Sequence, residues 1–400
     1  MRNLLPTAVF LATLTVASGM LAAATSRAWS APDPALSRSQ ARLALALIER
    51  LAKDGTGATT VSPASLDQAF AIVGEGADAA MRAAIAEALG FEGGEAQRSL
   101  ASILAARARL AQNEGDVLQS ADRLIVEPGA ALSPELVKRL TDIGVPAEEM
   151  DLSKAEAIRE VNAWVRRLTR GVIPEILSEP LPRPAFVALN ALHFKGKWQT
   201  PFDAKLTSPA PFTGADGARA DARMMHLAEG RRALRTEDRF VAIDLPFADE
   251  RFSLVVVTTI DRPARAAEFA GLAEWVAGKG FTLRKGDLAL PKFALSGRYD
   301  LLPTLDDLGL AKARRSPTAL AGFGPGATLA GVLQRTAIEV DEEGAEAAAA
   351  TAVIATRAMR PTEEQPVHMV VDKPFLFALR ETESGLILLA GYVGEAPKAR

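Results

Sequence analysis

The stretch "ALNALHFKGKWQTPFD", residues 188–203, indicates its local structure more clearly than the segments around it. It continues an apolar run, "AFVALNALHF", which is rich in residues favoured in strands. The run ends at Lys195 and Gly196, and Trp198 and Pro201 follow shortly after. We therefore expect a strand that ends near Phe194 and a turn directly behind it.

Helices are expected before this strand and further strands after it. Apolar residues recur at helical spacing over 36–52 and 62–76, and Ser62 followed by Pro63 is typical of a helix start. Residues 155–177 are expected to form one further amphipathic helix followed by a turn. Strand-like runs follow at 239–247, 251–260, 281–293, 336–340 and 376–393. Because helices and strands do not alternate regularly, the pattern predicts an α+β fold.

Composition describes an ordinary globular protein. The chain has 400 residues, of which 48% are hydrophobic and 24% charged, and its formal net charge is −3. No long linker interrupts residues 40–340, which favours one large domain. With 46 basic and 49 acidic residues, no dominant electrostatic partner is indicated, and we expect no nucleic-acid binding. The chain has no cysteine, so its stability has to come from packing.

The first 30 residues have the features of a secretory signal. Arg2 precedes an apolar stretch from about Leu4 to Leu21, and small residues follow. We expect cleavage near residues 24–30 and a protein that is periplasmic or secreted, without a membrane attachment after removal of the signal. A retained membrane anchor is the less favoured alternative.

No catalytic constellation stands out. The three histidines, His193, His226 and His368, lie in or beside apolar strand-like runs, where a structural role is favoured. The chain has no metalloprotease, nucleophile-elbow or P-loop motif. We therefore expect no enzymatic activity, no metal and no cofactor.

A family resemblance enters at the opening stretch. Residues 188–203 resemble the N-A-x-x-F-K-G-x-W-x-x-P-F signature of the serpins, and the agreement is nearly complete. The segments "SPASLDQAFAIVGEGA", "VNAWVRRLTRGVI", "ARMMHLAEG", "LPKFALSGRYDLLPTLDDLGL" and "DKPFLFALRETESGLILLAGYVGE" are similar to further serpin segments in the same order. The resemblance covers roughly residues 36–397.

The resemblance implies one serpin domain over residues 36–397, with three β-sheets, eight or nine helices and a metastable native fold. It also implies an exposed reactive loop at about residues 342–368. In inhibitory members a target serine protease attacks this loop as a substrate. The cleaved loop then inserts into the main sheet as an extra strand and traps the acyl-enzyme. This implies a suicide-substrate inhibitor of serine endopeptidases, with cysteine endopeptidases as a secondary target class.

The loop segment "DEEGAEAAAATAVIATRAMR", residues 341–360, permits two local interpretations. Alanine favours a helix, whereas Gly344 and the β-branched second half favour a strand. A segment that has to fit between packed strands needs small side chains, which favours the strand. The hinge of the loop is expected at Glu342, Gly344, Ala345, Glu346, Ala347, Ala348, Ala349, Ala350 and Thr351. A non-inhibitory serpin, acting as a binding or chaperone-like protein, is the alternative.

Family spacing implies Ala358–Met359 as the scissile bond. A small apolar residue at this position suits elastase-like or subtilisin-like proteases. A shift by one residue gives Arg357–Ala358, which would suit trypsin-like proteases through an acidic specificity pocket. The expected partner is therefore one serine protease, and the protein itself is expected to be a monomer.

The resemblance also implies a region where the main sheet opens. Trp198 belongs at its upper end, where Lys292 and Glu342 are expected to form a surface ion pair contributing about 0–1 kcal/mol. Ser62, Ser65 and Asn190 match a polar cluster beneath the central strands. Gln334 stands where many serpins have a histidine, so a hydrogen bond is expected there without a pH-sensitive group.

Overall fold

The computed structural model describes residues 34–92, 101–106, 117–181, 186–329, 331–344 and 365–398. These ranges belong to one unit, residues 32–400, and the predicted signal lies outside the described residues. Within these ranges, no helix is both long and apolar enough to span a membrane.

Helices form most of the first part of the chain, as expected. Ser62 caps α2, because its hydroxyl accepts a hydrogen bond from the amide of Ser65 and Pro63 occupies the first turn. Residues 101–106 are also helical. The α-helices are α1 (Pro34–Leu51), α2 (Pro63–Glu75), α3 (Ala79–Ala88), α5 (Pro134–Asp142), α6 (Ala155–Leu168), α7 (Ala273–Val276), α8 (Leu302–Leu305) and α9 (Ala311–Arg314).

The described strands form three hydrogen-bonded sheets. The largest has the order β1-β14-β13-β8-β7-β6-β9-β12, with β5 paired to β6, and the others have the orders β3-β2-β4 and β10-β11. The strands are β1 (Thr59–Val61), β2 (Leu118–Val126), β3 (Ala147–Glu149), β4 (Phe186–Phe194), β5 (Ser208–Thr213), β6 (Arg219–Glu237), β7 (Phe240–Pro246), β8 (Phe252–Thr259), β9 (Thr282–Pro291), β10 (Phe293–Asp300), β11 (Leu333–Val340), β12 (Val367–Val370), β13 (Phe375–Glu381) and β14 (Ile387–Val393).

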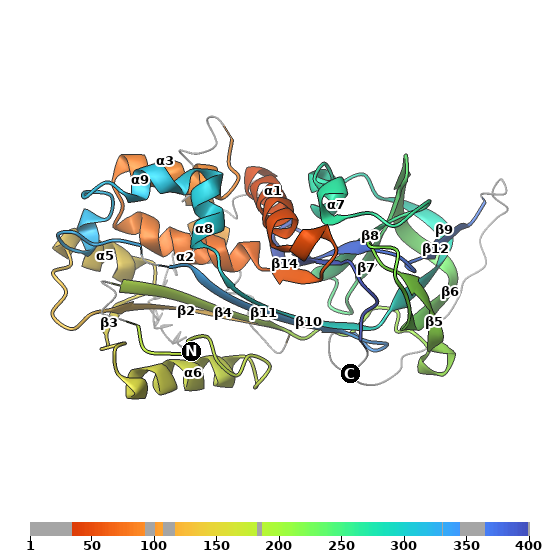
Figure 1. Ribbon diagram of the computed structural model, residues 1–400, viewed down its shortest axis with the longest axis horizontal. Coiled ribbons are helices and arrows are strands. Elements are labelled where there is room, and N and C mark those ends of the chain that lie inside the picture. The colour runs from red at the N-terminus through yellow and green to blue at the C-terminus, as the bar shows by residue number, and fades with distance from the viewer. Residues whose placement is uncertain are drawn as a thin grey trace, which may run out of the picture. The chain divides into compact units, whose positions relative to one another are not determined.

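The two smaller sheets lie side by side, with β4 next to β11 (Figure 1). Helix α2 covers one face of these strands and α6 the other (Figure 1). A second group of apolar side chains packs between α6 and this face, and it includes Val161, Val165 and Leu189. The α+β class and the arrangement of three sheets that the sequence predicts are confirmed.

The main core lies against the central strands of the large sheet. Strands β8, β13 and β14 are buried along their whole length, so both of their faces are covered. This explains why their sequences are mostly apolar rather than alternating. Phe252, Phe375 and Phe377 are among the largest fully buried side chains.

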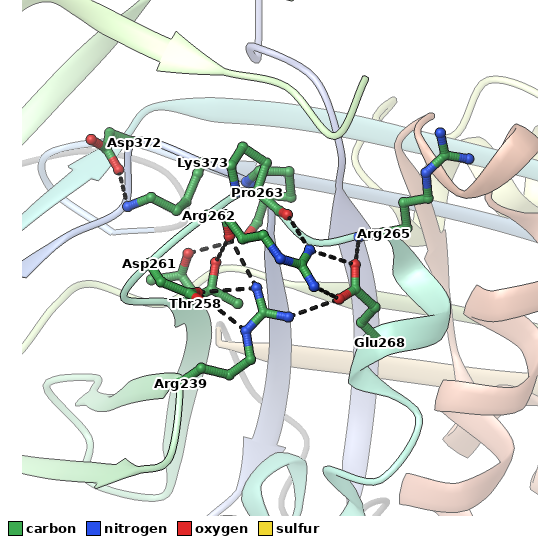
Figure 2. Close-up of polar contacts among 11 residues, drawn as sticks. Arg239, Thr258, Asp261, Arg262, Pro263, Arg265, Glu268, Asp372 and Lys373 are labelled. Atoms are coloured by element: carbon green, nitrogen blue, oxygen red, sulfur yellow. Dashed lines mark hydrogen bonds and ion pairs between the residues drawn. The ribbon is translucent and has the colours of Figure 1, made fainter. Parts of the chain in front are cut away.

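The turn that follows β8 is held by the ion pairs shown in Figure 2. Arg239 donates to Asp261 at 3.0 Å and to Glu268 at 2.7 Å, and Arg262 also donates to Glu268 at 2.7 Å. The hydrogen bond from Arg262 lowers the pKa of the Glu268 carboxyl to about 2, although partial desolvation opposes the shift. These charges satisfy one another, which indicates a structural role in fixing the turn.

Candidate functional site

Strands β4 and β11 are neighbours that do not pair. They belong to different sheets, so no ladder of hydrogen bonds joins them within the described residues. Side chains from both strands, including Val187, Leu333 and Ala337, pack against the same apolar cluster. The facing edges of the two strands therefore offer backbone donors and acceptors to an additional strand.

At one end the gap between β4 and β11 is closed by backbone contacts. The amide of Trp198 donates to the carbonyl of Glu343 at 2.9 Å, and the amide of Phe202 donates to the carbonyl of Glu342 at 2.8 Å. Lys197 and Gly344 form an isolated antiparallel bridge. The chain that leaves β11 is thus fixed to the turn that follows β4 at the first residues of the predicted reactive loop.

Trp198 anchors this closure, at the end of the sheet where the sequence predicts it. Its side chain is buried and stacks on Phe247 with ring centroids 4.5 Å apart and an interplanar angle of 13°. Its indole Nε1 donates to the carbonyl of Asp341 at 2.9 Å. The ring therefore joins the large sheet to the end of β11.

Gly344 lies where the two segments approach most closely. Its φ is +148°, and a Cβ at this position would lie 2.1 Å from the carbonyl oxygen of Gly196 and 2.7 Å from Lys197 Cα. These neighbours are backbone atoms, which cannot move aside as a flexible side chain can. Only glycine fits this position while the closure is intact.

Lys292 and Glu342 form the ion pair that the sequence predicts, with Nζ and Oε2 2.7 Å apart. The expectation of a surface pair is wrong, because the side chain of Glu342 is only 11% exposed and that of Lys292 29%. Burial alone raises the pKa of the Glu342 carboxyl, but the hydrogen bond from Lys292 and further contacts outweigh it, so the pKa lies below its ordinary value. Removing Lys292 would leave the largely buried charge of Glu342 without its partner. Breaking this pair should therefore destabilise the closure more than breaking a surface pair would.

A polar clamp lies below the gap, where α2 begins. The side-chain amide of Gln334 accepts from the backbone amide of Ser62 and donates to the carbonyl of Ser62, both at 2.9 Å. The Ser62 hydroxyl donates to the carbonyl of Leu388 at 2.7 Å and lies 2.7 Å from Ser65 Oγ. Thr336 Oγ1 donates to the carbonyl of Thr60 at 2.9 Å. The clamp ties β11 to β1, α2 and β14, and Gln334 makes the hydrogen bonds expected of it.

Some predicted residues cannot be placed. Asn190 lies in β4, paired with Asp122 of β2, but the structure does not describe its side chain. The remainder of the predicted hinge and both versions of the scissile bond lie outside the described residues; these are Ala345, Glu346, Ala347, Ala348, Ala349, Ala350, Thr351, Arg357, Ala358 and Met359. Their roles stay predictions.

Residues of the closure that the sequence analysis missed are Asp341 and Phe247. The Asp341 carboxylate accepts from the amides of Glu343 and Gly344 at 2.9 and 3.1 Å. The order Asp-x-x-Gly is typical of such a turn and was available in the sequence. No local sequence pattern marks Phe247 in the same way, because its contact with Trp198 forms only when distant segments pack together.

Comparison with known proteins agrees with this geometry. The family model described as "Serpin (serine protease inhibitor)" matches residues 38–395. The leukocyte elastase inhibitor of Bos taurus is 30% identical over 374 residues, covering 89% of this chain and 98% of the relative. Serpin B8 of Homo sapiens is 31% identical over 349 residues, with coverages of 82% and 91%.

The fold comparison gives the same result. The crystal structure of the thermophilic serpin tengpin in the native state matches with a TM-score of 0.77 and 21% identity, covering 91% of this chain and 95% of that one. The family model alone spans most of the chain, and the residues of the closure and of the clamp lie within it. This chain belongs to the serpin family.

Proposed function

We propose that this protein inhibits serine endopeptidases by trapping the acyl-enzyme through insertion of its cleaved loop between β4 and β11. The observation that carries the proposal is the unpaired facing edges of these two strands, one of which leads directly into the loop. An inserted strand would pair with both edges and satisfy backbone groups along their length. The matched family and the named elastase inhibitors support protease inhibition.

Insertion is in competition with hydrolysis of the acyl ester, so its rate decides the outcome. The segment from Ala345 to Ala350 contains five alanines and one glutamate, so its side chains can pass between packed layers. With strand alternation, Ala345, Ala347 and Ala349 point inward and Glu346 points to solvent. The protein itself acts as a substrate of its target and carries out no catalysis.

The proposed target is an elastase-like or subtilisin-like serine protease that cleaves Ala358–Met359. The elastase inhibitors among the relatives support this choice. A trypsin-like protease that cleaves Arg357–Ala358 is the alternative. We further propose that the mature protein acts outside the cytoplasm as a monomer, after removal of the first 24–30 residues. No nucleic acid or cofactor enters this mechanism.

The first test incubates the mature protein separately with pancreatic elastase, subtilisin and trypsin. We expect a covalent complex that survives denaturing electrophoresis with one of the first two enzymes, and mass spectrometry should locate the cut after Ala358. A complex formed only with trypsin, and a cut after Arg357, would move the scissile bond by one residue.

A matched pair of variants tests insertion. Ala349→Arg places a charge on the inward face and should convert the inhibitor into a substrate, whereas Ala348→Arg faces solvent and should still form the complex. If the wild-type loop is cut by all three enzymes without any complex, inhibition fails for these targets. The chain would then act as a binding or chaperone-like protein.

A further inference from the structure

A pocket of about 160 Å³ lies behind the closure, where the turn after β4 meets strands β6, β7 and β9. One wall is aromatic and aliphatic, formed by Trp198, Phe202, Leu245 and Pro246. Leu283 of β9 also lines the pocket, and this large apolar side chain is 63% exposed. The pocket therefore offers apolar surface that the described part of the protein leaves uncovered.

Two guanidinium groups line the same pocket, those of Arg231 and Arg232 on β6. Arg231 donates to the carbonyl of Leu283 at 3.1 Å, and Arg232 donates to the carbonyl of Ala228 at 2.9 Å. Among the described residues, neither has a carboxylate within 4.0 Å. Arg232 Nε is buried and has no hydrogen-bond partner there. Both cations are thus held mainly by neutral carbonyl groups.

Two carboxylates lie near these cations, and each has another partner. Asp244, which lines the pocket, forms an ion pair with Arg380 through one oxygen, and its other oxygen is buried without a hydrogen-bond partner among the described residues. Asp287 interacts with Arg232 only at longer range. The Asp287 carboxylate lies 2.6 Å from Nδ1 of His368. Burial lowers the pKa of the Arg232 guanidinium, and Asp287 opposes this only partly. A half-buried cation without a carboxylate in direct contact is costly, and a bound anion would reduce that cost.

We propose that this pocket binds a small carboxylate with an apolar body, such as a short fatty acid or an aryl-substituted acid. The carboxylate would lie against Arg231 and Arg232, where charge-assisted hydrogen bonds are strongest. The apolar body would cover Leu283 and the ring of Trp198.

Occupation of the pocket also regulates the loop, and this step rests on the proposed function. Trp198 lines the pocket, while its indole Nε1 donates to the carbonyl of Asp341 directly after β11. A ligand packed against the ring therefore stabilises the closed gap. Because insertion requires the closure to open, the ligand should slow insertion and increase the fraction of molecules that are cleaved without trapping the protease.

The binding experiment titrates the mature protein with 3-phenylpropionate and, as a neutral control, 3-phenylpropanol, by calorimetry. We expect the acid to bind with one site per chain and the alcohol to bind at least about tenfold more weakly. Arg232→Gln should weaken binding of the acid by about tenfold or more. The matched variant Arg223→Gln, an exposed arginine on the same strand that does not line the pocket, should bind as the wild type does.

Two results would overturn the proposal. One is the absence of binding up to about 10 mM acid, which is weak even for so small a ligand. The other is equal binding of acid and alcohol, which would leave the arginines without a role. Binding is measured without any protease, so it stays informative even if no target is inhibited. Where inhibition is observed, saturating acid should raise the number of inhibitor molecules consumed per protease in the wild type but not in Arg232→Gln.

Discussion

The buried carboxyl of Asp67 lowers the stability of this fold. Its side chain lies in α2 and is buried, with Gln40 of α1 donating to one carboxyl oxygen at 2.6 Å. The other oxygen has no partner among the described residues. Gln40 in turn accepts from the amide of Ile387 in β14 at 2.7 Å. Burial raises the pKa of the Asp67 carboxyl to about 8, and the hydrogen bond from Gln40 opposes this only in part.

The raised pKa predicts how stability depends on pH. In the unfolded chain the Asp67 carboxyl loses its proton near its ordinary pKa of about 4, whereas in the folded chain it keeps the proton up to about 8. Between these values the folded state binds more protons, so its free energy of unfolding falls as pH rises. Asp67→Asn should remove this contribution and raise the free energy of unfolding at pH 7.5 by about 1–3 kcal/mol.

Urea unfolding from pH 4 to 8 measures this effect. Asp307→Asn, which replaces an exposed carboxylate, should follow the wild-type profile. Parallel profiles for Asp67→Asn and the wild type would show that Asp67 is ionised in the folded protein at neutral pH, contrary to the prediction.

At the scale of elements, the clamp on Ser62 decides how β11 is held above α2. Gln334 uses an amide oxygen and an amide nitrogen, neither of which titrates. We expect Gln334→His to be within about 1 kcal/mol of the wild type at pH 8, where a neutral imidazole can still accept a hydrogen bond. At pH 5.5 a charged imidazole could no longer accept from the amide of Ser62.

In Gln334→His, the pKa of a buried histidine that has to stay neutral lies below its unfolded value of about 6.5. Its contribution is therefore present above pH 6.5 and is lost as pH falls, by about 1–2 kcal/mol. The decisive measurement is the change in urea midpoint between pH 8 and pH 5.5. Gln334→Ala serves as the control, because it should be destabilised at both pH values alike; an unchanged midpoint for the histidine variant would contradict the prediction.

Elements were predictable from the sequence where burial left a clear run of apolar residues or where a helix start had its typical residues. The apolar runs gave β4, β7, β8, β13 and β14 nearly to the residue, and Ser62-Pro63 gave the start of α2. Strand β6 was recognised only over its Met-Met segment, because arginines and glutamates interrupt its pattern. Residues 155–177 form the predicted helix followed by a turn: α6 ends at Leu168, and the next residues turn with Arg170 and Gly171 at positive φ.

The candidate site was only partly predictable, because it depends on contacts between distant segments. The family resemblance placed Trp198, Glu342 and Lys292 in one region, and the structure brings them together there. The burial of the ion pair and the contact of Trp198 with Phe247 arise from packing that no local pattern encodes. The same holds for the buried carboxyl of Asp67, which the sequence presents as an ordinary polar residue in a helix.

At the scale of the whole molecule, the unpaired strands predict a large gain in stability on cleavage. An inserted segment of about ten residues would pair with both edges and add about twenty ladder hydrogen bonds, each contributing about 1 kcal/mol. For a chain of this size we expect the melting temperature to rise by about 20 °C after the loop is cut. Differential scanning calorimetry of the native and cleaved forms measures this. In Ala349→Arg the cut form should melt within a few degrees of the native form. An equally large rise in the melting temperature of this variant would show that the gain in stability does not come from insertion.

The two open edges have a consequence for how the protein has to be handled. They can accept any extended segment of suitable shape, including one from a second copy of the chain, and such encounters become more frequent with the square of concentration. Dilution would thus protect the active form, while concentrated stocks would lose it progressively on warming. With no cysteine to cross-link the fold, non-covalent contacts such as those at Trp198, Gly344 and Gln334 keep these edges closed during storage.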